Sequence, residues 1–170
     1  MANKFRVDIY MDDLLEARRT FDAMGELPAK IVTSAARRGA TVVKNAVKRN
    51  SKVPVRTGAL RSGITLSKVE KSKLRGKKVY EVVFDAKMND VFQKRIKRRG
   101  LLGGQSEHGY YPASMEYGYL AHDGVGGIRF MPGRHFMRDE GEAQRENAKN
   151  VMAKKFNERI QKEWVKRHGS

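Results

Sequence analysis

The stretch PAKIVTSAARRGATVVKNAVKRN, residues 28–50, decides the fold of this chain. Its apolar residues recur at steps of three and four, and most of its cations fall on the opposite face, so it predicts a long amphipathic helix. Pro28 suits the first turn of a helix, where its missing N–H costs nothing. The helix should end near Asn50, because the residue before Pro54 is pushed out of the helical region. Small residues would let a second backbone approach this helix closely: Ala35, Ala36, Gly39 and Ala40.

Two segments after this helix have the composition of strands. The first contains Ile64, Leu66 and Val69, and the second is VYEVVF within residues 78–85. β-Branched and aromatic residues favour a pleated, half-buried surface, and a polar turn at residues 71–76 separates the segments. They predict an antiparallel hairpin, which should lie against the long helices because two strands alone are barely stable. In its second strand, Val79, Glu81 and Val83 should face opposite to Tyr80, Val82 and Phe84.

The ends of the chain add further elements. Residues 4–11 alternate between apolar and polar side chains, which predicts a short strand, and residues 14–24 predict a short helix. Residues 136–168 predict a long C-terminal helix, because an apolar stripe recurs there at helical spacing: Ala148, Val151, Met152, Phe156, Ile160 and Trp164. We therefore predict a single α+β domain over residues 1–170. In it, the long helix of the N-terminal half and the long C-terminal helix pack a small antiparallel sheet.

Two stretches lack this periodicity. Residues 86–109 form a basic, glycine-containing insertion, which we expect to be flexible for most of its length. Within it, residues 90–99 predict a short helix whose few apolar anchors are Val91, Phe92 and Ile96. Residues 118–133, GYLAHDGVGGIRFMPG, are rich in glycine and predict a second loop.

The charge balance limits the classes of partner. Of 170 residues, 36 are Lys or Arg and 19 are Asp or Glu, which gives a net charge of +17. So much positive charge repels itself and usually implies an anionic partner, such as nucleic acid, an acidic protein surface or anionic lipid. Lipid is the weakest of these, because no stretch approaches the ~20 apolar residues of a membrane span. The N-terminal residues also lack the pattern of a signal peptide, so we expect a cytoplasmic protein that can join a particle.

No residue pattern in the chain predicts catalysis. There is no cysteine, which excludes a disulfide, a thiol nucleophile and a cysteine-based zinc site. The sequence contains none of four common catalytic or nucleotide-binding motifs, namely HExxH, GxSxG, a Walker loop and a dinucleotide-binding loop. The four histidines are far apart, and isolated loop histidines are rarely ligands: His108, His122, His135 and His168. We predict no catalytic, metal or cofactor site, and a protein that is not an enzyme.

The densest basic run lies in the insertion and is the strongest functional candidate on charge alone. It consists of Lys94, Arg95, Lys97, Arg98 and Arg99. Each phosphate that a cation neutralises releases condensed counterion, so the run suits salt-sensitive, sequence-independent contact with DNA. It suits equally well an acidic surface on a neighbouring protein, or a solvated segment that keeps an assembly protein soluble. The sequence leaves these three alternatives open.

Three segments, in order along the chain, resemble a family of tailed-bacteriophage head–tail connector, neck and tail-completion proteins. VPVRTGALRSGI at residues 53–64 resembles the family form APVxTGxLRxSI. YYPASMEYG at residues 110–118 resembles YxPxxEYG, and MPGRHFMR at residues 131–138 stands where the family has a proline–arginine–phenylalanine–arginine signature. The matching residues are Pro54, Thr57, Gly58, Leu60, Arg61, Tyr111, Pro112, Glu116, Tyr117, Gly118, Pro132, Arg134, Phe136 and Arg138.

The resemblance implies a structural protein without catalytic activity or cofactor. Family members are small α+β subunits that form a ring, commonly of six copies, in the neck or at the head-facing end of the tail. The implied partners are other copies of the chain, neighbouring connector, stopper or tail-tube proteins, and the genome DNA that passes through; no membrane is implied. Such a protein is made in the cytoplasm of the host bacterium and ends in the virion. Residues 86–109 depart from the pattern, because family members commonly have far fewer residues there.

The motif residues also have a physical interpretation of their own. Pro54 makes the chain extended, Thr57 and Gly58 supply a turn, and Leu60 returns an apolar side chain to the core. Arg61 and Glu116 suit an ion pair between the first two segments, although two exposed, unpaired side chains are the alternative. The rival function is that of a basic DNA-binding or packaging protein. An enzyme, chiefly a nuclease, is the third alternative.

Overall fold

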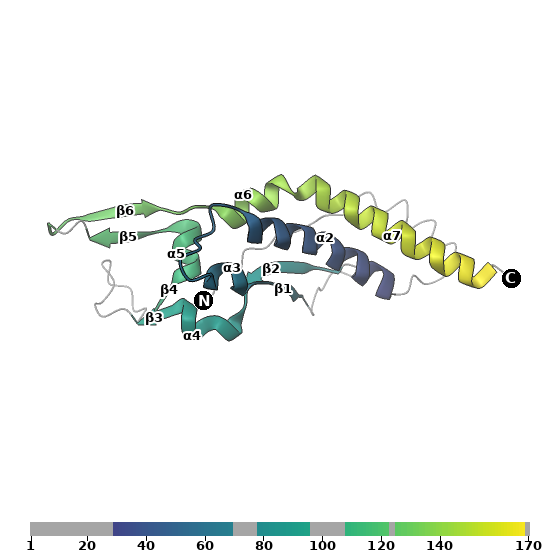
Figure 1. Ribbon diagram of the computed structural model, residues 1–170, viewed down its shortest axis with the longest axis horizontal. Coiled ribbons are helices and arrows are strands. Elements are labelled where there is room, and N and C mark those ends of the chain that lie inside the picture. The colour runs from purple at the N-terminus through teal and green to yellow at the C-terminus, as the bar shows by residue number, and fades with distance from the viewer. Residues whose placement is uncertain (1–28, 70–77, 96–107, 123–124, 169–170) are drawn as a thin grey trace.

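The computed structural model describes residues 29–69, 78–95, 108–122 and 125–168, and shows an elongated α+β molecule (Figure 1). The strand and helix predicted within residues 4–24 lie outside the described residues. Two long helices extend to one end of the molecule, and a two-stranded hairpin extends to the opposite end (Figure 1). The predicted α+β class is confirmed.

The two longest helices lie side by side and run in opposite directions (Figure 1). Helix α2 spans Ala29–Arg49, which confirms the helix predicted from residues 28–50, and α7 spans Arg145–His168. The predicted close approach of a second backbone is also confirmed, at Gly39. A Cβ atom added there would collide with the side chain of Met152 on α7. The interface therefore depends on a residue without a side chain at this crossing.

The predicted hairpin is confirmed as β1, Ile64–Lys68, and β2, Tyr80–Phe84. The two strands are antiparallel, and Ile64 lies opposite Phe84. Helix α2 packs against both strands and, on its other side, against α7 (Figure 1). The long C-terminal helix thus covers the sheet mainly through α2, with which it shares its largest interface.

The expected insertion at residues 86–109 is partly built into the fold. Its described residues form a 3-10 turn, a short helix and two paired strands: η1 at Ala86–Met88, α4 at Asn89–Phe92, β3 at Gln93–Arg95 and β4 at His108–Tyr110. The described helix is therefore shorter than the predicted residues 90–99, and it is followed by strand β3. The physical reason is Phe92, whose side chain is 0% exposed and anchors the segment in the core. Residues 96–107 lie outside the described part of the chain.

The glycine-rich stretch is a β-hairpin rather than the expected loop. Helix α5, Tyr111–Tyr117, leads directly into β5, Gly118–His122, which pairs antiparallel with β6, Ile128–Pro132. The glycines at positions 126 and 127 fall between the strands, and the strands hold aromatic and aliphatic residues such as Leu120 and Phe130, which lie opposite each other. The hairpin projects from the body of the molecule (Figure 1).

The predicted C-terminal helix is interrupted once. Helix α6 spans Phe136–Ala143 and α7 begins at Arg145. At Gln144 the backbone leaves helical geometry, with φ −91° and ψ 2°, yet its carbonyl still accepts the N–H of Ala148 at 2.8 Å. The apolar stripe is confirmed where Ala148, Met152 and Phe156 are buried.

The core lies where the sheets meet the helices, and aromatic rings from four elements meet in it, beside aliphatic side chains such as Val43 and Leu60. Phe84, Phe92, Tyr110 and Phe136 come from β2, α4, β4 and α6. Their rings meet edge to face, with centroids 5.7 Å apart for Phe84–Phe92, 6.5 Å for Phe84–Phe136 and 6.1 Å for Phe92–Tyr110. Such edge-to-face pairs add about 0.5–1.5 kcal/mol each beyond the area that they bury. These contacts hold β4, and therefore α5 behind it, on the body.

Candidate functional site

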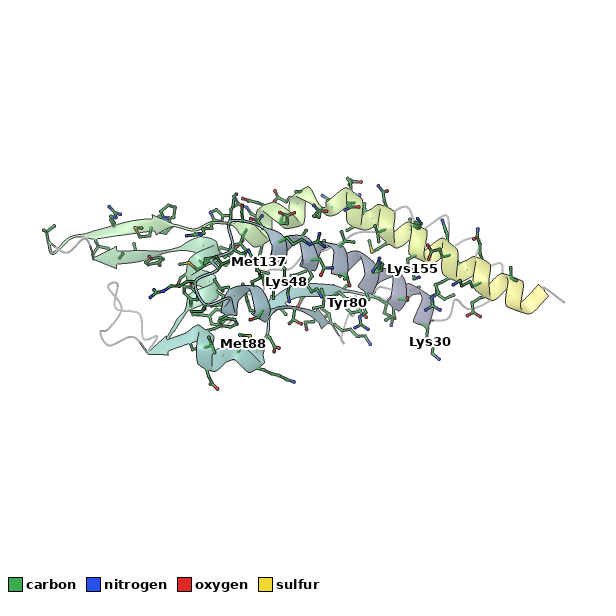
Figure 2. The ribbon with its side chains drawn as sticks, in the orientation of Figure 1. Lys30, Lys48, Tyr80, Met88, Met137 and Lys155 are labelled. Atoms are coloured by element: carbon green, nitrogen blue, oxygen red, sulfur yellow. The ribbon has the colours of Figure 1, made fainter. Side chains whose placement is uncertain are left out.

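The three segments that resemble the family motifs meet at one place, which we call the motif junction. It comprises residues 53–64, 110–118 and 131–138, and side chains from all three segments pack in one hydrophobic cluster, among them Leu60, Tyr111 and Phe136. Met137, at the start of α6, lies close to the middle of the ribbon near α2 and α5 (Figure 2). The junction joins the body of the molecule to the projecting hairpin β5–β6.

The first segment makes the predicted turn. Gly58 adopts φ 70° and ψ −8°, a left-handed conformation that glycine tolerates best. The short helix α3, Ala59–Gly63, follows at once, and it delivers Leu60 into the core at 2% exposure. The hydroxyl of Thr57 accepts the N–H of Ala59 at 3.4 Å. The roles predicted for Thr57, Gly58 and Leu60 are therefore confirmed.

Glu116, in the second segment, is the most informative residue of the junction. Its side chain is 2% exposed, although an ionised carboxylate is normally at the surface. One carboxylate oxygen accepts the N–H of Met137 at 3.0 Å, and the other accepts the N–H of Arg138 at 3.1 Å. Both N–H groups belong to the first turn of α6, where a helix leaves its donors without internal partners. Glu116 is thus an N-terminal cap supplied from another helix.

This cap replaces one that the local sequence does not provide. The N-cap position of α6 is His135, at φ 49°, and its side chain makes no capping hydrogen bond. Side chains that cap from this position are usually Ser, Thr, Asp or Asn. The negative charge of Glu116 also lies at the positive end of the helix dipole, which is favourable.

Backbone contacts hold the second and third segments in register. The N–H of Arg134 donates to the carbonyl of Met115 at 2.8 Å, and the N–H of His135 donates to the carbonyl of Glu116 at 3.1 Å. Gly133 makes this approach possible, because a Cβ atom added there would collide with the carbonyl oxygen of Glu116. The end of α5 and the start of α6 therefore form one rigid corner.

Polar contacts join the residues just before the first segment to the third segment and to the residues that follow it. The guanidinium of Arg134 donates to the carbonyl of Lys52 at 3.1 Å, and the ammonium of Lys52 pairs with Asp139 at 2.8 Å. The side-chain amide of Asn50 donates to the carboxylate of Glu140 at 2.8 Å. No local pattern of the sequence marks Asn50, Lys52, Asp139 and Glu140, because their partners lie far away along the chain. These four residues were therefore missing from the predicted site.

The predicted ion pair between Arg61 and Glu116 is wrong. Both oxygens of Glu116 are directed at the first turn of α6, whereas the guanidinium of Arg61 donates to the carbonyl of Asn50 at 3.5 Å. The Nε atom of Arg61 is buried without a hydrogen-bond partner among the described residues. Glu116 is thus satisfied by backbone donors, which a pairing argument based on side-chain charges does not consider.

The remaining motif residues divide between core and surface. Tyr111 is half-buried against the core, and Pro112 is buried in the first turn of α5. Tyr117 is partly exposed, and its phenol pKa is raised by burial and then by the negative charge of Glu116. Burial likewise raises the pKa of Tyr110. These phenols are therefore neutral at ordinary pH.

The other motif residues comprise a glycine with positive φ, three residues at or near the surface and one core residue. Gly118, at φ 96°, ends α5 and begins β5, and a side chain there would collide with the neighbouring strand. Pro54 is half-buried, whereas Pro132 and Arg138 are exposed. Arg138 pairs with Asp139 at 3.0 Å, and Phe136 is 0% exposed in the core.

The structure describes two residues of the basic run. Lys94 and Arg95 belong to β3, where they lie opposite Gly109 and His108 of β4. Lys97, Arg98 and Arg99 lie outside the described residues. A second basic surface follows α2, which contains no Asp or Glu, and Lys30 and Lys48 mark its two ends (Figure 2). Its cations are Lys30, Arg37, Arg38, Lys44, Lys48 and Arg49.

The described residues bring together no metal-binding set. Among residues 29–69, 78–95, 108–122 and 125–168, no group of three His, Asp or Glu side chains is close enough to hold a metal ion. Within the same part of the chain, no helix has the length and apolar character that crossing a membrane requires. The hydrogen bonds of the motif junction instead join one structural element to another.

Comparison with known proteins identifies the family that the motifs predicted. Residues 16–114 match the family described as "Bacteriophage HK97-gp10, putative tail-component". The match covers more than half of the 170 residues, includes the whole first motif segment and ends inside the second. No similar protein was found among curated proteins, and no similar chain was found among solved structures. The chain therefore belongs to the HK97-gp10-like family of bacteriophage tail components, and it is a structural protein of the virion.

Proposed function

We propose that this chain is the subunit of a ring in the phage neck or at the head-facing end of the tail, where it completes the tail and joins it to the head. The observation that carries this proposal is its membership of a tail-component family over residues 16–114. In this proposal the whole chain, residues 1–170, is one α+β domain, and six copies form the ring. The ring contacts neighbouring connector, stopper or tail-tube proteins.

The geometry of the motif junction supports an architectural role. Glu116 and Gly133 fix the corner between α5 and α6, so the hairpin β5–β6 is held at a defined angle to the helical body. A ring subunit needs such rigidity, because small errors in the angle between its contact surfaces prevent closure. The hydrogen bonds from Asn50 to Glu140 and from Arg134 to Lys52 tie the same corner to the end of α2.

The positive charge supports a second element of the proposal, which is non-specific contact with the genome DNA that passes through the ring. Helix α2 has cations along its length and no acidic residue, and the basic run from Lys94 to Arg99 adds a second cluster. Within the described part of the chain, no cation of α2 forms an ion pair with a carboxylate, so these cations are available to phosphates. The same observation favours the rival function, a DNA-binding or packaging protein that acts without forming a ring.

Native mass spectrometry and negative-stain images of the purified chain test this proposal. We expect a closed ring in the absence of DNA. A protein that stays monomeric at all concentrations, and binds duplex DNA strongly at low salt, would overturn the ring and favour the rival. In the phage or prophage that encodes the chain, a stop codon in its gene should leave filled heads and tails that do not join. Normal joined particles from this variant would contradict the proposed role.

A further inference from the structure

The projecting hairpin has an apolar surface that the described part of the chain leaves exposed. We call β5 and β6 the arm; among the described strands, they pair only with each other. Leu120 and Phe130 lie opposite each other, and Ile128 lies on the same face. Their side chains are 43%, 60% and 47% exposed. Exposed apolar patches on a soluble protein mark contact surfaces, and an isolated two-stranded hairpin gains stability when another surface covers it.

A groove elsewhere on the same chain has the complementary character. It has a volume of about 520 Å³ and lies between the sheet β1–β2 and helix α5. Leu66, Phe84 and Ala113 contribute apolar wall, and the charged residues that line it are all acidic, namely Glu81, Asp85 and Glu116. The net charge of the chain is +17, but the groove is lined by carboxylates and by no Lys or Arg. The charge of the groove is thus opposite to that of the chain as a whole.

Glu81 is the carboxylate of the groove that is left for a partner. Glu116 accepts the N–H groups of α6, and Asp85 accepts the N–H of Lys87 at 3.0 Å. Glu81 is only 8% exposed, but no hydrogen bond or ion pair within the described part of the chain involves its carboxylate. A nearly buried carboxylate gains most from a cation that arrives with the surface that covers it.

The arm carries such a cation. Arg129 is the only Lys or Arg in its two strands, and among the described residues its side chain makes one weak contact, from Nε to the sulfur of Met131 at 3.3 Å. Arg129 lies on the face of the arm opposite to Phe130. An arm that enters the groove would therefore present Phe130 to the wall formed by α5 and Arg129 to the wall formed by β2.

We propose that the arm of one copy docks in the groove of the next copy, where Arg129 pairs with Glu81. Two copies that each carry +17 repel one another, so contact between copies is favoured where the surfaces are not basic, and the arm and the groove meet this condition. Because the two surfaces differ, the contact is head-to-tail, and repeated contacts of this kind close into a ring. The inference rests on the proposed function as a ring subunit.

Charge reversal tests the pairing. We compare the wild type with Arg129→Glu, Glu81→Lys and the double exchange by native mass spectrometry across protein concentrations. Each single reversal should raise the concentration needed for assembly by about tenfold or more, and the double exchange should restore it. The matched controls are Arg159→Glu and Glu142→Lys, exposed side chains on α7 and α6. Circular dichroism shows whether each variant folds. If Glu81→Lys does not fold, the milder variant Glu81→Gln replaces it in the comparison.

A disulfide trap provides an independent test, because the chain has no cysteine of its own. The double variant Arg129→Cys with Glu81→Cys should form, on oxidation, a ladder of covalent multimers that ends at the ring number. Neither single variant should form it, since a disulfide requires Cα atoms within about 7 Å. Suppose that the wild type forms rings, that the double cysteine variant does not crosslink, and that the single charge reversals assemble normally. This result would overturn the proposed contact but not the ring. A wild type that never assembles would overturn both.

Discussion

The carboxylate of Glu116 lies 3.0 Å from the backbone nitrogen of Met137, so a buried acid at the end of α5 caps the helix that follows the arm. The same carboxylate reaches the nitrogen of Arg138 at 3.1 Å. One side chain thus sets the relative position of α5 and α6, and with it the direction in which β5 leaves the body. Substitutions at this corner should therefore destabilise the fold more than substitutions at exposed positions of the same helices.

Replacing Glu116 by alanine should lower the free energy of unfolding by about 2–3 kcal/mol, because two N–H donors lose a charged acceptor and at least one of them is buried. Glu116→Gln should be less severe, because it keeps one acceptor oxygen but loses the charge that favours the helix N-terminus. Urea denaturation followed by circular dichroism measures both effects. The control is Glu146→Gln, whose side chain is mostly exposed in a surface pair with Lys149 and should change stability by less than about 0.5 kcal/mol.

Gly133→Ala should be among the most damaging small substitutions at the junction. The added methyl group would collide with the carbonyl oxygen of Glu116, a backbone atom that cannot move aside as a side chain can. We expect a loss of at least about 2 kcal/mol. Gly58→Ala is the matched control: Gly58 has φ 70° but no atom within 4 Å of an added Cβ, so the cost should be limited to about 1–2 kcal/mol of backbone strain. Equal melting temperatures for the two variants would contradict this account of the corner.

The contact between Lys52 and Asp139 predicts a specific response to acid. The hydrogen bond from Lys52, with a second from Arg138, lowers the pKa of Asp139 below its ordinary value of 3.8. A carboxyl group with a lowered pKa in the folded state stabilises the fold when ionised, so its contribution is complete well above pH 3.8 and is lost as the pH falls through the folded-state pKa. Asp139→Asn should therefore melt below the wild type at pH 7, and the difference should shrink as the pH falls below 3.8.

Lys52→Met identifies the cause of this response. It removes the main donor to Asp139 but leaves Arg138 in place. In the Lys52→Met background, the further change Asp139→Asn should lower the melting temperature at pH 7 less than it does in the wild type. An unchanged difference would mean that Lys52 does not stabilise the ionised carboxylate.

Much of the fold could be predicted from the sequence because its signals are local. The helical spacing in α2 and the β-branched run of β2 each lie within one element, and Pro28 and Pro54 bracket α2. The hairpin β5–β6 was missed because glycines at its turn outweighed the alternation of Leu120, Phe130 and their neighbours. Phe92 of helix α4 was predicted as an anchor, but its burial depends on Phe84 of strand β2 and Tyr110 of strand β4.

The candidate site was predictable in location but not in chemistry. The turn at Gly58 and the burial of Leu60 follow from local residue types. The cap formed by Glu116 depends on where α5 lies relative to α6, which no sequence spacing gives. One local signal does point to it: His135 at the N-cap position is a poor capping residue, so a helix that begins there requires an acceptor from elsewhere for its free N–H groups.

The salt dependence of DNA binding separates the alternatives for the basic run. If Lys94, Arg95, Lys97, Arg98 and Arg99 contact DNA, replacing all five by glutamine should reduce the dependence of duplex affinity on salt. The slope of the logarithm of affinity against the logarithm of salt concentration should fall by about 0.9 for each phosphate that the variant no longer neutralises. Fluorescence anisotropy with labelled duplex DNA between low and moderate salt measures this slope.

The matched control neutralises Arg37 and Arg38, two exposed cations on α2. A fall in slope with the five-residue variant and none with this control would assign the phosphate contacts to the insertion. The reverse result would assign them to α2. A third result is that both variants keep the wild-type slope but the five-residue variant no longer assembles with its neighbours in the phage. Removal of the charge would then affect protein contact alone, so the insertion would bind an acidic protein surface.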